Sequence, residues 1–124
     1  MEKIITRLYL RKHPFHIFVF GDNCERRGYG GAAALRDMTN TYGFITKKSP
    51  THSDRDYYRP KEYEAVYFVE MEKLKQEILH NPTKHYLISK LGAGLANRYN
   101  IFEQVIEPNI RKDLAQFSNV EFLW

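Results

Sequence analysis

The chain has 124 residues, 43% of them hydrophobic and 27% charged, so it is expected to fold as one domain over residues 1–124. The single cysteine, Cys24, excludes an internal disulfide, and no apolar run approaches the roughly 18 residues of a membrane span. The net charge of +4 favours anionic partners such as nucleotides or nucleic acid. Because the chain does not start like a signal peptide, we expect a cytoplasmic protein with no membrane partner.

In chain order, the hydrophobic pattern alternates between strands and helices. Strands are predicted over residues 4–10, 16–20, 42–46, 86–89 and 120–123. Helices are predicted from Ala32 to Arg36, from Pro60 to the Asn81-Pro82 stop, and over residues 101–117. Pro108 should kink or split the last helix, because proline has no N–H to donate within it.

Two of these segments, residues 17–20 and 86–89, are mainly apolar or aromatic, which is typical of interior strands covered on both faces. The alternation predicts an α/β fold with three layers, α/β/α, and a mixed sheet. In such sheets ligands bind beyond the carboxyl ends of strands. The two glycine-rich segments, residues 21–31 and 90–97, both follow strands and precede predicted helices.

The first glycine-rich loop carries Asp22 and Asn23 directly after a strand, where they can hydrogen-bond ribose hydroxyls or an adenine amino group. Small residues then leave backbone N–H groups unobstructed at a helix start, which suits a diphosphate. These residues are Gly28, Gly30, Gly31 and Ala32. The alternative is a tight turn followed by a small-residue helix packed on the sheet.

The second glycine-rich loop again places small residues between a strand and a predicted helix. Its candidate ligand-binding residues are Gly92, Ala93, Gly94 and Leu95. Backbone N–H groups in this loop can face another part of the same anion. Two such loops in one small domain favour a shared diphosphate cradle over two unrelated turns.

Three motifs occur in order along the chain: Gly28-Tyr29-Gly30-Gly31-Ala32, Phe44-Ile45-Thr46-Lys47-Lys48 and Leu91-Gly92-Ala93-Gly94-Leu95. This ordered set resembles the macro domain, an ADP-ribose-binding module, and within it the terminal ADP-ribose protein glycohydrolase branch. It also looks like small proteins of bacteria and their viruses that carry Val-Phe-Gly-Asp-Asn near the start, as residues 19–23 do here.

The resemblance implies a macro-type fold, abbreviated at the N-terminus, whose two glycine loops hold the diphosphate and distal ribose of ADP-ribose. It places Thr46 at the ligand and carries the catalytic lysine of the glycohydrolases over to Lys47. That branch has an aspartate directly after Gly-x-Gly-Leu, and this chain has Ala96 there. Asp22, at a strand end, is the candidate substitute acid.

A neutral lysine beside the pocket can attack the masked aldehyde of the distal ribose, whereas a charged Lys47 can simply pair with phosphate. Three functions therefore stay open: an ADP-ribosyl hydrolase, a non-catalytic binding module or sponge for an ADP-ribose-type signal, and a small basic nucleic-acid-binding protein. No cofactor is expected, and no metal, because the histidines lack metal-ligand spacing. The sequence leaves the oligomeric state open.

Overall fold

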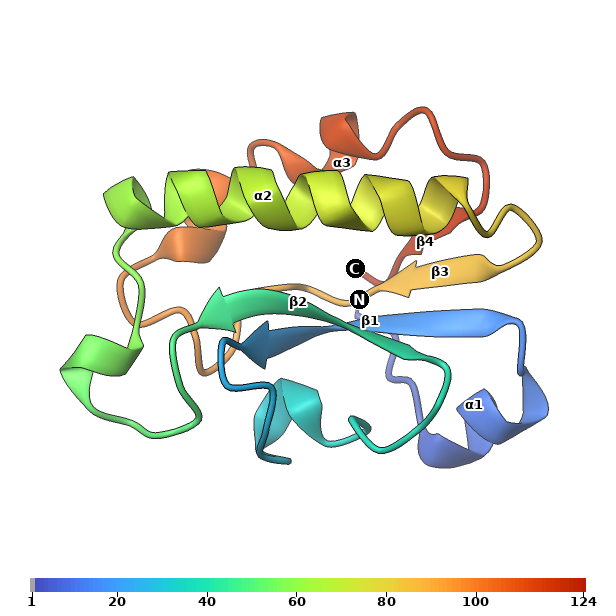
Figure 1. Cartoon of the computed structure of the whole chain (residues 1–124), viewed down its shortest axis with the longest axis horizontal. Helices are drawn as coiled ribbons and strands as arrows, with labels where there is room; N and C mark the ends of the chain where they lie inside the picture. Colours follow the sequence, from blue (N-terminus) through green and yellow to red (C-terminus); the bar gives the residue numbers. More distant parts are fainter. Residues whose placement is uncertain (1) are drawn as a thin grey trace.

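The computed structural model describes residues 2–124 and has an α/β fold built on one four-stranded sheet (Figure 1). The strands are β1 (His16–Asn23), β2 (Thr41–Lys47), β3 (His85–Ile88) and β4 (Val120–Phe122). Their order across the sheet is β2-β1-β3-β4, and all three pairings are parallel. The expected α/β class is confirmed, but the sheet is parallel and not mixed.

Helical segments lie on both faces of this sheet. They are α1 (Arg7–Lys12), η1 (Gly31–Ala33), η2 (Asp54–Asp56), α2 (Pro60–Leu79), η3 (Phe102–Ile106) and α3 (Ile110–Asp113). Figure 1 shows α2 and α3 on one face and α1 on the other, so the sheet is the middle of three layers. No helix within residues 2–124 is both long enough and apolar enough to cross a bilayer.

The two strands predicted to be interior, β1 and β3, are the central strands of the sheet. Val19 and Ile88 are paired across them and have no exposed surface. Helix α2 begins at the predicted Pro60 and buries Tyr63, Leu74 and Ile78 against this core. Burial of that apolar stripe is what holds the longest helix on the sheet.

The prediction of a strand over residues 4–10 is wrong, because this segment contains helix α1. Thr6 caps the helix: its Oγ1 accepts a hydrogen bond from the Tyr9 backbone N–H at 3.1 Å. Only Leu10 of the helix is fully buried, so the apolar residues of this segment do not form the buried face expected of a strand. The cap supplies a local hydrogen bond that favours a helical start over an extended one.

The predicted helix over residues 101–117 is split, as Pro108 indicated. The first part, η3, is a π-helix, and α3 begins only at Ile110. Proline between the two segments removes a backbone donor. A helix was also expected from Ala32 to Arg36, but the structure has only the single 3₁₀ turn η1 there.

Candidate functional site

A pocket of about 430 Å³ opens beyond the carboxyl ends of β1, β2 and β3. Both glycine-rich loops reach it, one following β1 and the other following β3. The predicted site residues that line it are Asp22, Asn23, Gly28, Gly30, Gly31, Ala32, Thr46, Lys47, Gly92, Gly94 and Leu95. The fold therefore brings the two loops together, although they are far apart in the sequence.

Ala93 is the one predicted ligand-binding residue that is absent from the pocket lining within residues 2–124. It is partly buried against the hydrophobic core, and its backbone N–H donates to the Lys90 carbonyl oxygen at 3.1 Å. That turn directs the neighbouring Gly92 and Gly94, and not Ala93, toward the pocket. A role for Ala93 in binding the ligand therefore stays a prediction, without support from the pocket lining.

The pocket glycines differ in what surrounds them. Gly92 has φ +79°, and a Cβ built on it would lie 2.6 Å from Cδ1 of Ile106, so this position requires glycine for the fold. A Cβ added to Gly30 or Gly94 would meet no heavy atom within 4 Å beyond the adjacent residues of the chain. These two positions therefore face open space at the pocket, where a ligand can approach the backbone closely.

Neither glycine loop leads into a long helix at the pocket, contrary to the sequence-based expectation. The first is followed by the single turn of η1. The second continues through turns until Ile101; the Asn97 N–H, for example, donates to the Gly94 carbonyl oxygen at 3.0 Å. Hydrogen-bond donors for a ligand must therefore come from loop peptide groups and side chains, and not from a helix dipole.

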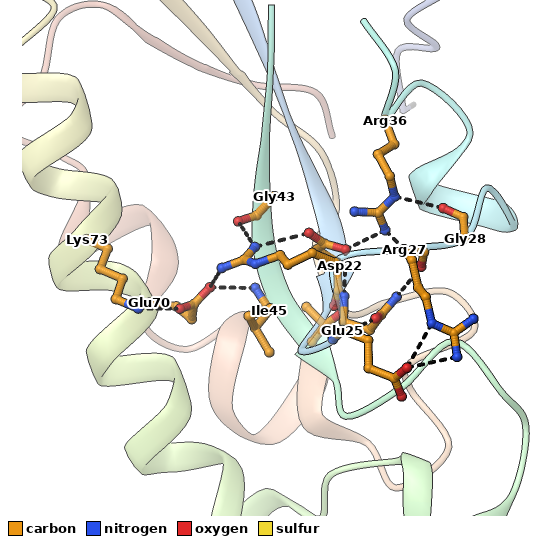
Figure 2. Close-up of polar contacts among 12 residues, drawn as sticks. Asp22, Glu25, Arg27, Gly28, Arg36, Gly43, Ile45, Glu70 and Lys73 are labelled. Atoms are coloured by element: carbon orange, nitrogen blue, oxygen red, sulfur yellow. Dashed lines mark hydrogen bonds and ion pairs between the residues drawn. The ribbon is translucent and has the colours of Figure 1, made fainter. Parts of the chain in front are cut away.

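Asp22 lines the pocket, but its carboxylate is already engaged by protein donors (Figure 2). Its side chain is 2% exposed. Oδ1 accepts from Arg36 Nη2 at 2.5 Å and from the Asn23 N–H at 2.8 Å, and Oδ2 accepts from Arg26 Nη1 at 3.0 Å. Both carboxylate oxygens already accept hydrogen bonds from protein donors, so the acid role of Asp22 stays a prediction that these contacts do not favour.

Lys47 ends β2 and is 8% exposed. Its Nζ donates to the Thr51 carbonyl oxygen at 2.8 Å and lies 4.5 Å from the centre of the Tyr57 ring. Burial lowers the pKa of Lys47 below its ordinary value and the nearby Arg98 adds to this, while Asp56 acts in the opposite direction. Among residues 2–124 no carboxylate forms a salt bridge with Lys47.

Four further polar or charged residues, not selected from the sequence, line the described pocket: Arg27, His52, Ser89 and Lys90. Lys90 comes two residues after the end of β3 and directly after the predicted strand over residues 86–89, so its position was a usable signal. His52 lies in a long loop, and no local sequence pattern predicts that this loop reaches the pocket. The charge of Asp22 is compensated by Arg26 and Arg36, and Arg27 is paired with Glu25 at 2.8 Å, so Lys47 and Lys90 are the pocket-lining cations without a carboxylate salt bridge among residues 2–124.

Ala96, the position where the sequence resemblance leads one to expect an aspartate, also lines the pocket and is buried. The pocket wall here is a methyl group, which neither donates nor accepts a proton. Cys24 is exposed, and its Sγ lies 3.2 Å from the Tyr58 hydroxyl. Neither residue supplies an acid or base to the pocket.

Residues 1–98 match a family of unknown function, DUF7831. Comparisons with curated proteins and with solved structures return no match. The matched segment contains both glycine loops, β1, β2, α2 and β3, and thus every pocket residue named above. Since this match spans about four-fifths of the 124 residues, the chain belongs to the DUF7831 family of unknown function.

Proposed function

We propose that the pocket binds ADP-ribose or a closely related NAD-derived nucleotide, with the diphosphate between the two glycine loops. The observation that carries the proposal is that glycines of both loops line one pocket beyond the carboxyl ends of central parallel strands: Gly28, Gly30, Gly31, Gly92 and Gly94. Ligands of open α/β sheets bind at such places. The ordered motifs that resemble the macro domain support the same ligand class.

The size and charge of the pocket fit this ligand. Its volume of about 430 Å³ lies within the range typical of small-molecule sites. Arg27, Lys47 and Lys90 provide cationic groups for a diphosphate, and the open positions Gly30 and Gly94 allow close approach to the backbone. A concave site of this size favours a nucleotide over the extended surface expected of a nucleic-acid-binding protein.

Calorimetric titration with ADP-ribose, AMP and NAD tests the proposal. We expect ADP-ribose to bind more tightly than AMP, because AMP lacks the second phosphate. Gly30→Val and Gly94→Val should each weaken ADP-ribose binding at least about tenfold by filling the approach to the backbone. Ala115→Val, which adds the same branched bulk at an exposed position outside the pocket, is the control.

Absence of measurable affinity of the wild-type protein for all three nucleotides would refute the proposal. A steep loss of binding to any polyanion with increasing salt, without preference for ADP-ribose, would favour the nucleic-acid-binding alternative. Both outcomes are distinguishable from a specific site, whose affinity should respond to the two glycine variants.

Hydrolysis of an ADP-ribosyl derivative is the second candidate function, and Lys47 is the observation that favours it. Its burial and lowered pKa increase the fraction of neutral amine available for attack on a ribose aldehyde. Ala96 and the fully engaged Asp22 leave the pocket, within residues 2–124, without a free carboxylate to shuttle protons. The arrangement therefore favours binding and sequestration over turnover.

A further inference from the structure

Arg36 reaches back from beyond η1 to the first glycine loop (Figure 2). Its side chain is 14% exposed. Nε donates to the Gly28 carbonyl oxygen at 2.8 Å, and Nη2 donates to Asp22 Oδ1 at 2.5 Å and to the Arg27 carbonyl oxygen at 3.3 Å. One planar guanidinium group thus joins the end of β1 to two successive carbonyl groups of the loop.

Asp22 is held in place from the opposite side by the neighbouring strand. Gly43 of β2 has no side chain there, and a Cβ on it would lie 2.3 Å from Asp22 Oδ2. Arg26 Nη1 donates both to this Oδ2 at 3.0 Å and to the Gly43 carbonyl oxygen at 2.9 Å. The carboxylate that orients Arg36 is therefore linked to the backbone of β2 through Arg26.

The network continues to helix α2 through Glu70. This buried carboxylate accepts from the Ile45 N–H at 2.7 Å, and its Oε1 lies 3.9 Å from Arg26 Nη2. Figure 2 shows the line of contacts running from α2 across the edge of β2 to the first loop. The loop is consequently tied to two rigid elements of the fold.

The arrangement determines which side of the loop faces away from Arg36. In a trans peptide group the carbonyl oxygen and the following N–H point in opposite directions. Arg36 holds the carbonyl oxygens of Arg27 and Gly28, so the N–H groups of Gly28 and Tyr29 point away from Arg36. Asn23 Nδ2 reinforces this by donating to the Arg27 carbonyl oxygen at 2.8 Å.

We propose that Arg36, aimed by Asp22, is a positioning residue for the nucleotide site. Arg36 holds two carbonyl oxygens of the first loop away from the ligand, because these oxygens would repel a phosphate. The adjoining N–H groups are then available to the ligand. Arg36 does not itself line the pocket formed by residues 2–124, so it acts through the loop. The inference rests on the proposed function, because it assigns a role in binding the same nucleotide.

The test is titration of Arg36→Lys with ADP-ribose. Lysine keeps the charge but lacks the fork that engages Asp22 and the Gly28 carbonyl group together. We expect affinity to fall about tenfold or more, as for loss of charge-assisted hydrogen bonds that orient a site. Arg7→Lys is the matched control: Arg7 forms an equivalent two-point pair with Asp37, at 2.8 and 3.0 Å, outside the pocket.

Gly43→Ala disturbs the same contacts from the side of β2; the contacts of Arg36 with Asp22 and with the carbonyl groups of Arg27 and Gly28 are called the clasp below. The added methyl group must displace the Asp22 carboxylate. We expect Gly43→Ala to weaken ADP-ribose binding. The Gly43→Ala/Arg36→Lys double variant should have nearly the same affinity as the single variant that binds ADP-ribose more weakly, because both substitutions disrupt the same contacts. Wild-type affinity in folded Arg36→Lys and Gly43→Ala proteins would overturn the inference while leaving the proposed function intact. Failure of wild-type protein to bind ADP-ribose would overturn both.

A measurement on the wild-type protein guards against variants that do not fold. Titration of ¹⁵N-labelled protein with ADP-ribose should shift the amide signals of Gly28 and Tyr29, because their N–H groups are the ones that the clasp leaves free. Saturable ADP-ribose binding that moves neither signal would show that the clasp serves the fold alone.

Discussion

Lys47 Nζ lies 4.5 Å from the centre of the Tyr57 ring and donates to the Thr51 carbonyl oxygen at 2.8 Å. The aromatic ring and the carbonyl group both favour the charged amine, whereas burial favours the neutral one. The net direction is a lowered pKa with burial as the largest cause. Lys47 is thus placed to act either as a phosphate partner or as a nucleophile, and substitution separates these roles.

The first prediction concerns Lys47 as a phosphate partner. Lys47→Arg should keep ADP-ribose affinity within about threefold of wild type, because the positive charge is retained. Lys47→Ala should weaken it about tenfold, as for loss of one charge-assisted contact. Isothermal titration measures both. Equal losses in the two variants would contradict a purely electrostatic role.

The second prediction concerns chemistry at Lys47. A nucleophilic lysine forms a Schiff base with the open-chain distal ribose of ADP-ribose, releasing water, and borohydride reduces this adduct to a stable amine. Because the described pocket lacks a free carboxylate to shuttle protons, we expect little or no trapped adduct and little or no turnover of ADP-ribosylated carboxylates. Mass spectrometry after borohydride treatment provides the measurement, with Lys47→Ala as the blank. A wild-type adduct located on Lys47 would establish the enzyme instead.

The sequence predicted the interior strands and α2 because their apolar residues follow one period over a long segment, as from Tyr63 to Ile78. It predicted the meeting of the two loops because both follow parallel strands. The sequence could not predict that the Asp22 carboxylate is paired with Arg26 and Arg36, since these residues reach Asp22 only through the fold. The six-residue helix α1 was missed because a single Thr6 cap outweighs a weak strand pattern.

The third prediction compares two glycines of the second loop. Gly92→Ala should destabilise the protein by about 1–3 kcal/mol, since alanine is strained at φ +79° and its Cβ would meet Ile106 at 2.6 Å. Gly94→Ala should change stability by less than about 0.5 kcal/mol, because nothing lies within 4 Å of the added methyl group. Urea denaturation of the two variants gives the comparison. Similar stabilities would show that the backbone at residue 92 relaxes without cost.

The last prediction concerns three histidines at the amino end of the sheet, opposite the pocket. The His16 ring lies 4.9 Å from that of His13 and 4.8 Å from that of His85, and its Nδ1 is 2.8 Å from the Tyr9 hydroxyl. Glu121, which is paired with His85 at 2.9 Å, is the carboxylate of this cluster. Burial is the main cause that lowers the pKa of His16 from 6.5, the neighbouring His85 and His13 add to this, and Glu121 opposes it.

The sign of the pH dependence follows from that direction. The unfolded chain binds a proton at His16 more readily than the folded one, so stability is complete above about pH 6.5 and falls as the pH drops toward the lowered folded pKa. For one proton the slope is at most about 1.4 kcal/mol per pH unit. The lowered pKa values of Glu121 and Asp37 act in a separate window, below their ordinary values of 4.5 and 3.8.

Urea denaturation from pH 7.5 to 5.0 measures this dependence. The free energy of unfolding of the wild-type protein should decrease over the interval, and His16→Asn, whose side-chain oxygen can still accept from Tyr9, should reduce the slope. His80→Asn, at the exposed end of α2, is the control and should keep the wild-type slope. If His16→Asn and wild type show the same slope, burial of His16 among the other two rings does not make the fold acid-sensitive.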